Sequence, residues 1–274
     1  MTSIPWITIL IVVPLLAALV LWFVPALHKY ARIYGLVISI AVFAAAAVMA
    51  SGFDLGKAAS FQFEQTLPWI PAIGVSYAVG INGLGLLMVL LATALVPIVI
   101  AADWNVVPSG SEGNAESPTD RRRATFVALV LVLTSLMVAV FAARDLFLFY
   151  FVFEVMLLPV YFLIGMFGGA NRRAAAIKFL LYSLAGGLIM LVGVVMTYLA
   201  GPRGDEGFLI ENLTGVVTDP ITQRWLFLAF FIAFAVKAPM WPVHTWLPDA
   251  AAQATPGTST LLVGVLDKVG TFGM

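Results

Sequence analysis

Long apolar runs alternate with short polar segments along the chain, and most of the runs have the length of transmembrane helices. A helix needs ~20 apolar residues to cross a hydrocarbon core of ~30 Å. We therefore expect seven spanning helices, at residues 6–27, 33–49, 79–102, 124–142, 146–167, 174–200 and, shorter and interrupted by proline, 225–240. An eighth run begins near Thr258 and stops at Met274 without a polar tail, which indicates a fragment of a longer protein. The pattern predicts an all-α integral membrane protein with about eight transmembrane helices visible, the last of them truncated.

The composition indicates that lipid is the solvent for most of the surface. The 274 residues are 62% apolar and only 10% charged, whereas a soluble domain is roughly half apolar and a quarter charged. The net charge is zero, which gives no electrostatic argument for binding nucleic acid. With no cysteine and two histidines, the chain has no thiolate for a metal or an iron–sulfur cluster and disfavours a bis-histidine haem. We expect neither a cofactor nor a metal in this chain.

The distribution of basic residues predicts the orientation. The connections after the first, third and fifth runs hold eight Lys and Arg residues, and those after the second, fourth and sixth hold four. The positive-inside rule therefore places the first set in the cytoplasm and the N-terminus on the outer side. The first six residues contain no Lys or Arg, so they do not form the positive start of a signal peptide.

Two connections are long enough to have a character of their own. Residues 103–123 are rich in Ser, Gly, Pro and acidic residues, which predicts a flexible, solvated loop, either functional or simply a tolerated insertion. Residues 61–83 combine aromatic residues with Pro and Gly. This composition predicts an ordered loop on the outer face, such as a hairpin, or alternatively a set of interfacial aromatic anchors.

Charged residues inside the apolar runs are the first candidates for function: Glu154, Lys237, Asp267 and Lys268. Each costs at least ~2.5 kcal/mol at the bilayer centre, and such residues normally face a bundle interior and mark ion pathways. A helix rises 1.5 Å per residue. Counted from Arg144, Trp225 and Thr258 at the starts of their runs, Glu154, Lys237 and Lys268 therefore lie ~15–18 Å along their helices. We therefore expect one charged layer near the midplane, which suits lateral proton transfer.

A buried Glu154–Lys237 ion pair that only fixes helix packing is the alternative interpretation. The second lysine at the same depth favours a functional role. Burial disfavours a charged lysine and a nearby carboxylate favours it, so moving or protonating Glu154 would switch Lys237 between holding and releasing a proton. Asp267 either tunes Lys268 or faces a polar cavity, because helical neighbours point ~100° apart.

The seventh run contains a predicted break. Pro239 and Pro242 lack backbone donors and clash with the preceding turn, and irregular backbone at this depth survives only inside protein or beside a wet cavity. Transporters use such discontinuous helices at their ion sites. His244 follows the break, and it is either a structural hydrogen bonder or part of a proton relay.

Other residues have simpler explanations. Lys178 begins the sixth run and is expected to be a snorkelling anchor, and Trp241 and Trp246 are expected to be packing and interfacial anchors. Four glycines are expected to permit close helix packing: Gly165, Gly168, Gly186 and Gly187.

Several of these segments resemble the antiporter-like subunits of respiratory complex I. Residues 153–164, which begin Phe-Glu-Val-Met-Leu-Leu-Pro, resemble the fifth helix of that family. Residues 235–250, with Lys-Ala-Pro-Met-Trp-Pro-Val-His, resemble its broken seventh helix, and residues 264–270 are similar to its eighth. Trp69-Ile70-Pro71 and the segment 76–83 match its outer loop and the start of its third helix.

The resemblance implies a fold and a function. It implies two inverted five-helix repeats, of which this chain would hold the first at residues 124–274, after N-terminal helices at 1–123. Glu154 would pair with Lys237, and His244 and Lys268 would continue the proton relay, with Asp267, Lys178 and Asp145 as secondary candidates. The chain would be a non-redox, proton-translocating subunit of a bacterial inner-membrane NADH–quinone oxidoreductase. NADH, FMN, iron–sulfur clusters and quinone would be bound by other subunits, and antiporter-like neighbours would be its partners.

Three further readings remain beside this one. A subunit of a multi-subunit cation/proton antiporter would have the same helices and charges. A membrane scaffold would use the ion pair only for packing. A catalytic membrane enzyme is disfavoured because no metal cluster or nucleophile–base arrangement is visible.

The sequence departs from the family pattern at three places. Asn82 stands where the family usually has an acid. Residues 251–256 lack the histidine that often follows the Pro-Asp-Ala of the seventh helix, which leaves the water route to the eighth helix open to question. Asp267 replaces a residue that is commonly apolar, which affects the resting charge of Lys268.

Overall fold

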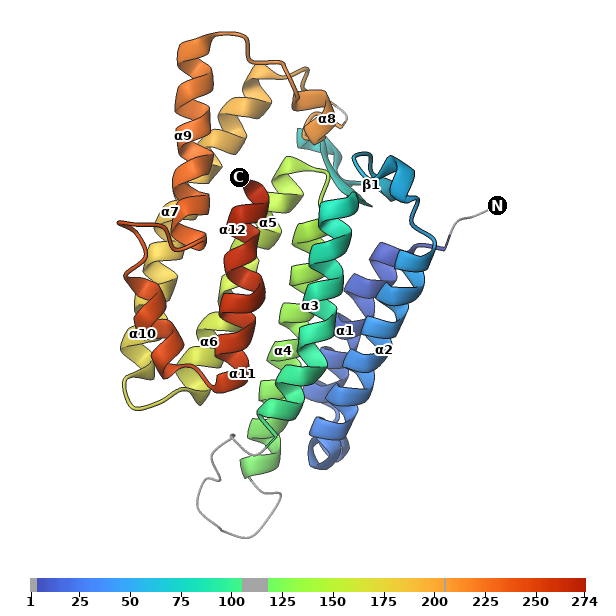
Figure 1. Cartoon of the computed structure of the whole chain (residues 1–274), viewed down its shortest axis with the longest axis vertical. Coiled ribbons are helices and arrows are strands. Elements are labelled where there is room, and N and C mark those ends of the chain that lie inside the picture. Colours follow the sequence, from blue (N-terminus) through green and yellow to red (C-terminus); the bar gives the residue numbers. More distant parts are fainter. Residues whose placement is uncertain (1–3, 105–117, 205) are drawn as a thin grey trace.

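The chain is a bundle of long, apolar helices that run up and down between two ends (Figure 1). The computed structural model describes residues 4–104, 118–204 and 206–274. Within these ranges, seven helical segments are long and apolar enough to cross a membrane. The prediction of a multi-pass, mostly helical membrane protein is therefore confirmed.

The first four helices pack as a group around one enclosed member. α1 (Trp6–Phe23), α2 (Ala31–Ser51) and α3 (Gly83–Ala102) all contact α4 (Pro118–Ala142). In α4, 83% of the apolar window is buried, against 39% in α1, because protein rather than lipid surrounds it. The proposed boundary between residues 123 and 124 stays a prediction.

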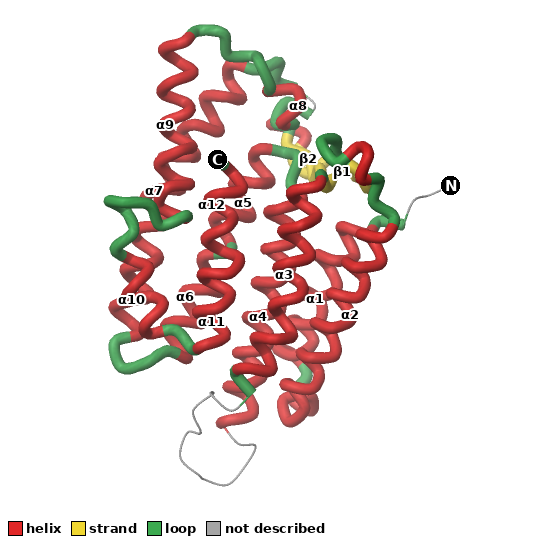
Figure 2. The backbone as a smooth tube through the Cα atoms, viewed as in Figure 1, coloured by secondary structure: helices red, strands yellow, loops and turns green. Residues whose placement is uncertain are grey.

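An antiparallel hairpin closes one end of the bundle (Figure 2). β1 (Gln62–Ile70) pairs with β2 (Val75–Ile81), which confirms the hairpin alternative for residues 61–83. The predicted start of the third span at residue 79 is wrong, since residues 79–81 complete β2 and α3 begins at Gly83. Asn82 sets this boundary as the N-cap, because its side chain accepts a hydrogen bond from Gly85 N at 2.8 Å.

The predicted loop at residues 103–123 is wrong at both of its ends. Residues 105–117 lie outside the described ranges, but α4 already begins at Pro118 and Asp103 is only 3% exposed. The Asp103 carboxylate accepts hydrogen bonds from Thr255 Oγ1 at 2.7 Å and Gly257 N at 3.0 Å. Asp103 therefore joins the end of α3 to the segment 255–257, far along the chain.

The fifth span is interrupted where a single helix was predicted. α5 (Leu146–Val155) ends one residue before α6 (Leu157–Phe167), with a turn at Met156. Pro159 explains the interruption, because it has no N–H to donate to the carbonyl of Val155. α7 (Arg172–Ala200) and the short α8 (Ile210–Leu213) follow.

The predicted break of the seventh span is confirmed. α9 (Pro220–Lys237) ends at Lys237, residues 238–245 form turns, and α10 (Trp246–Gln253) resumes the helix. The eighth segment consists of α11 (Pro256–Leu261), a π-helical stretch at Leu262–Leu266 and α12 (Asp267–Gly273). The repeat assignment for residues 124–274 stays a prediction.

Candidate functional site

Lys237 is the most deeply buried of the four charged residues inside the apolar runs. It is the last residue of α9 and is 2% exposed, and its Nζ atom is buried without a hydrogen-bond partner. The ammonium group lies 4.5 Å from the centroid of the Phe153 ring, which provides a cation–π contact. A buried ammonium with one aromatic contact and no hydrogen bond is costly to keep charged.

The helix break places Lys237 at the edge of irregular backbone. The last carbonyls of α9 find partners outside the regular ladder: Ala235 O accepts from Met240 N, and Val236 O accepts from the Trp246 indole, both at 2.9 Å. Trp246 is 1% exposed, so the expectation that it packs is confirmed, whereas Trp241 is 84% exposed. The break is thus stabilised by specific hydrogen bonds beside the lysine.

Glu154 lies on the neighbouring helix, next to the ring that contacts Lys237. It is half-buried, and its Oε1 atom is buried without a partner. Both residues are described, and they interact electrostatically, but no nitrogen–oxygen contact within 4.0 Å joins them. The direct ion pair that the resemblance implied is therefore not formed in this structure.

Gly187 on α7 makes the space that the Glu154 carboxylate occupies. A Cβ atom on Gly187 would overlap Oε1 and would lie 2.8 Å from Oε2. At Gly165 an added Cβ would meet only Ala176 Cβ, at 3.5 Å. The glycine at 187 is therefore required for this carboxylate position, beyond the general close packing that the sequence predicted.

Asp267 and Lys268 face different surroundings although they are neighbours. Asp267 is 7% exposed, and its Oδ1 atom is buried without a partner. It interacts electrostatically with Lys237 and Lys268. Lys268 is exposed on the surface of the described chain. The structure thus brings Glu154, Lys237 and Asp267 together and leaves Lys268 on the outer side of α12.

Two further predicted residues, His244 and Lys178, lie on the turn segment 238–245 and on α7. His244 is half-buried in the turn segment 238–245, with Nδ1 buried and unpartnered. Lys178 forms an ion pair of 2.6 Å with Asp249 of α10 and is about one-third exposed, so it joins α7 to α10. The relay roles of these residues stay predictions.

Asp145 is fully buried at the start of α5 and holds the hairpin to it. Its carboxylate accepts hydrogen bonds from Phe147 N, Leu148 N and Ser76 N, each at 2.9 Å. Burial raises the pKa of Asp145, and these backbone hydrogen bonds oppose the rise. Its contacts are those of a helix cap.

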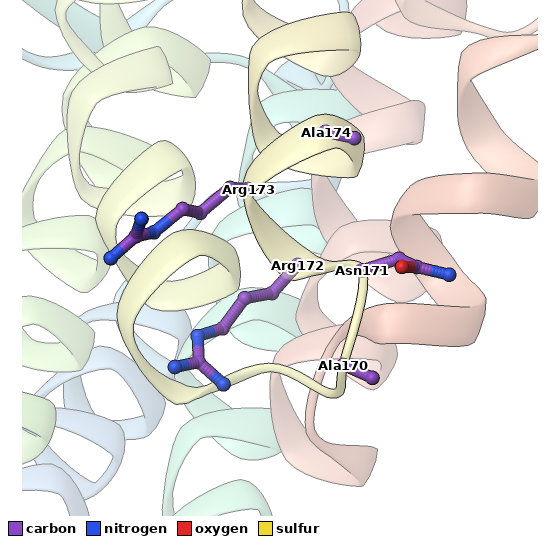
Figure 3. A pocket seen from close by; sticks show the side chains of 5 residues that line it. All are labelled: Ala170, Asn171, Arg172, Arg173 and Ala174. Atoms are coloured by element: carbon purple, nitrogen blue, oxygen red, sulfur yellow. The ribbon is translucent and has the colours of Figure 1, made fainter.

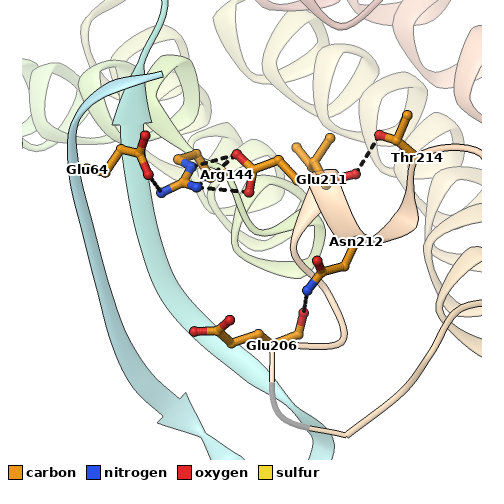
Figure 4. Close-up of polar contacts among 7 residues, drawn as sticks. Glu64, Arg144, Glu206, Glu211, Asn212 and Thr214 are labelled. Atoms are coloured by element: carbon orange, nitrogen blue, oxygen red, sulfur yellow. Dashed lines mark hydrogen bonds and ion pairs between the residues drawn. The ribbon is translucent and has the colours of Figure 1, made fainter. Parts of the chain in front are cut away.

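An ion cluster that was not predicted from the sequence lies beside this cap. Arg144 is 7% exposed, contacts both carboxylate oxygens of Glu211 at 2.8 Å, and reaches Glu64 at 2.7 Å. Figure 4 shows the guanidinium between these acids, which come from α8 and β1. The partners lie far apart in sequence, and the single local signal was an Arg-Asp pair between two apolar runs.

A surface hollow of about 380 Å³ lies at the opposite end, around the turn that begins α7. Figure 3 shows Ala170, Asn171, Arg172, Arg173 and Ala174 at this turn. Arg172 donates to the carbonyls of Gly168 and Gly169 at 3.3 Å, and Asn171 N donates to Gln253 Oε1. The Asn171 contact connects the turn to α10, and the hollow does not include the Lys237 cluster. Among the described residues, no group of three acidic or histidine side chains is placed to hold a metal.

Comparisons with known proteins agree with this geometry. Residues 143–274 match the family described as NADH:quinone oxidoreductase/Mrp antiporter, transmembrane. Subunit M of NADH-quinone oxidoreductase from Mycobacterium tuberculosis is 40% identical over 300 residues, which cover 100% of this chain and 54% of that protein.

Solved structures show the same fold. Respiratory complex I from Thermus thermophilus matches with a TM-score of 0.79 and 28% identity, covering 97% of this chain and 51% of that one. The Mrp complex from Dietzia matches with a TM-score of 0.77 at 19% identity, covering 97% and 27%, which supports the fold alone.

The broken helix and the buried lysine lie in the part of the chain, residues 143–274, that matches the NADH:quinone oxidoreductase/Mrp antiporter family. Relatives that match nearly all of its length include subunit M of NADH-quinone oxidoreductase from Mycobacterium tuberculosis and from Rhodobacter capsulatus, at 40% and 39% identity. The chain spans about half the length of the curated relatives it matches.

Proposed function

We propose that this chain is part of a membrane-arm subunit of a proton-pumping NADH–quinone oxidoreductase. It carries no electrons itself and moves protons through Glu154, Lys237, His244 and Lys268. NADH, FMN, iron–sulfur clusters and quinone bind to other subunits, and antiporter-like neighbours flank it in a bacterial inner membrane. The N-terminus faces the outer side of that membrane, as the basic residues indicate.

One observation carries this proposal: Lys237 is a buried amine at a helix break, without a hydrogen bond, within electrostatic reach of two carboxylates. Its charge depends on those carboxylates, because burial alone favours the neutral amine. A signal that moves or neutralises Glu154 therefore changes whether Lys237 holds a proton. Residues 238–245 form irregular backbone, and at membrane depth such backbone is tolerated only where it is buried in protein or lines a water-filled cavity.

The test is Lys237→Ala in the full-length protein, assembled in its complex and assayed in inverted membrane vesicles. We expect NADH-driven proton uptake and quinone reductase activity to fall ~10²-fold or more, as for the loss of a proton-transferring group. NADH oxidation by an artificial acceptor should be unchanged, which shows that the complex has assembled. Lys57→Ala, which removes an exposed lysine outside the spans, is the matched control and should pump normally. Normal pumping by Lys237→Ala would exclude the proposed role.

A subunit of a cation/proton antiporter is the second candidate, because the Dietzia Mrp complex has the same fold. Affinity purification of the full-length protein separates the two. NADH-oxidising subunits should co-purify with it if the first proposal holds. Sodium/proton exchange in vesicles without NADH oxidation would favour the second.

A further inference from the structure

Asp267 lies on the face of α12 that packs against the end of α9. Gly270 follows it by three residues and therefore shares that face. A Cβ atom on Gly270 would lie 2.6 Å from Ala238 N and 2.7 Å from Phe234 O. Since Phe234 and Ala238 stand on either side of Lys237 along the chain, this face of α12 abuts the backbone that carries the lysine.

A π-helical stretch at Leu262–Leu266 directly precedes the two neighbouring charges. It ends immediately before Asp267. Such stretches occur frequently at functional sites, and a wider turn rotates all later side chains relative to a regular helix of 3.6 residues per turn. Beyond this stretch, Asp267 is 7% exposed and Lys268 is exposed.

Three buried atoms around this contact lack hydrogen-bond partners: Glu154 Oε1, Lys237 Nζ and Asp267 Oδ1. Each is costly to bury alone, and each such group in a native structure requires an explanation. Lys237 is within electrostatic reach of both acids, which lie on α5 and α12. The cluster thus combines one buried lysine with two buried carboxylate oxygens that lack partners.

We propose that Asp267 is the acceptor of the proton that Lys237 releases, so that the transfer passes from the lysine to Asp267 before it reaches the surface of α12. This inference rests on the proposed function. In the step, the Lys237 ammonium gives one proton to an Asp267 carboxylate oxygen, which leaves a neutral amine and a carboxylic acid. Lys268, on the exposed side of the same turn, is then the next group to accept the proton.

Two substitutions at Asp267 distinguish proton transfer from packing. Asp267→Asn keeps the shape but binds no proton, and Asp267→Glu keeps the acid but adds a methylene to a packed position. For a proton acceptor, we expect Asn to lower NADH-driven pumping ~10²-fold or more and Glu to retain most of it. For a packing residue the order reverses, with Asn tolerated and Glu harmful. Equal pumping by wild type and Asp267→Asn also overturns the inference.

Controls keep the two proposals separate. Asp219→Asn is the matched control, because Asp219 is an exposed N-cap of α9 and Asn is an equally good cap. Lys237→Ala is measured in parallel. If it abolishes pumping while Asp267→Asn does not, only the role of Asp267 fails. If Lys237→Ala pumps normally, both proposals fail.

Infrared spectroscopy provides a readout that does not depend on turnover. The assembled wild-type complex should show a protonated-carboxyl band on acidification that is absent in Asp267→Asn and shifted in Lys237→Ala. Identical spectra for wild type and Asp267→Asn overturn the inference, even if both Asp267 variants are inactive. Artificial-acceptor activity confirms assembly of every variant.

Discussion

Replacing Gly187 by alanine would displace the Glu154 carboxylate without disturbing the helix that carries the change. The new Cβ would overlap Oε1 and lie 2.8 Å from Oε2. Both atoms are at the tip of a flexible side chain, so the carboxylate moves and the backbone does not. Alanine also favours a helix over glycine by ~1 kcal/mol, so we expect no loss of assembled protein. Because a misplacement of ~1 Å can cost ~10²-fold in rate, coupled activity should fall ~10- to 10²-fold.

The assay is NADH-driven proton uptake by vesicles that contain the full-length protein in its complex, with artificial-acceptor oxidation as the assembly control. Gly165→Ala is the matched variant, because its Cβ would meet only Ala176 Cβ at the ordinary contact distance of 3.5 Å. It should pump like wild type. Combining Gly187→Ala with Glu154→Asp provides a second check, since the shorter acid leaves room for the methyl group. Expressed as activation free energies of proton uptake, the loss in the double variant should therefore be smaller than the sum of the two separate losses, by ~0.5–3 kcal/mol.

The reasoning is refuted if Gly187→Ala pumps as well as Gly165→Ala. It is also refuted if the double variant shows simple additivity, because the effect of the alanine would then not act through the carboxylate. Loss of artificial-acceptor activity in Gly187→Ala would show that the added methyl disrupts helix packing instead.

Two further predictions concern stability, measured by thermal unfolding of the full-length protein. Arg144→Lys should destabilise the protein by ~1–3 kcal/mol, because lysine lacks the guanidinium fork that contacts both oxygens of Glu211 and also reaches Glu64. An unfolding temperature equal to that of the exposed control Arg224→Lys would contradict this prediction. Asp103→Ala should lower the free energy of unfolding by ~1–3 kcal/mol, because it leaves the buried Gly257 N–H without an acceptor, and Asp103→Asn should lower it less. Equal losses of stability in the two variants would argue against the hydrogen bond as the cause.

Local signals in the sequence predicted much of the fold. Apolar run length identified the spans, and Pro239 identified the break after Lys237, because a missing donor acts within a single turn. Pro159 lacks a donor in the same way and interrupts the fifth span at Met156, where a single helix was expected. The π-helical stretch before Asp267 has no compositional signal, because its residues are as apolar as those of any span.

Contacts between segments that are distant along the chain could not be predicted from the local sequence pattern. The partners of Arg144 come from β1 and α8, and the contact of Asp103 with Thr255 joins residues 152 positions apart. Depth along a helix placed Glu154 and Lys237 at a similar level, but depth gives no direction around the helix axis. For that reason the sequence did not predict that Asp267 would be buried, that Lys268 would be exposed, or that Glu154 would make no direct contact with the lysine.

The polar ties at the two ends of the bundle have a mechanical consequence. Asp145 and Arg144 join the hairpin, α5 and α8 at one end, and Asp103 joins α3 to the segment 255–257 at the other. Between these ends, the turn at Met156, the end of α9 and the π-helical stretch each interrupt a regular hydrogen-bond ladder. A helix bends most easily where its backbone hydrogen bonds are interrupted, and sharp helix kinks occur at such places. We therefore expect bending strain applied by a neighbouring protein to concentrate around Lys237, while both faces of the membrane-embedded bundle keep their shape.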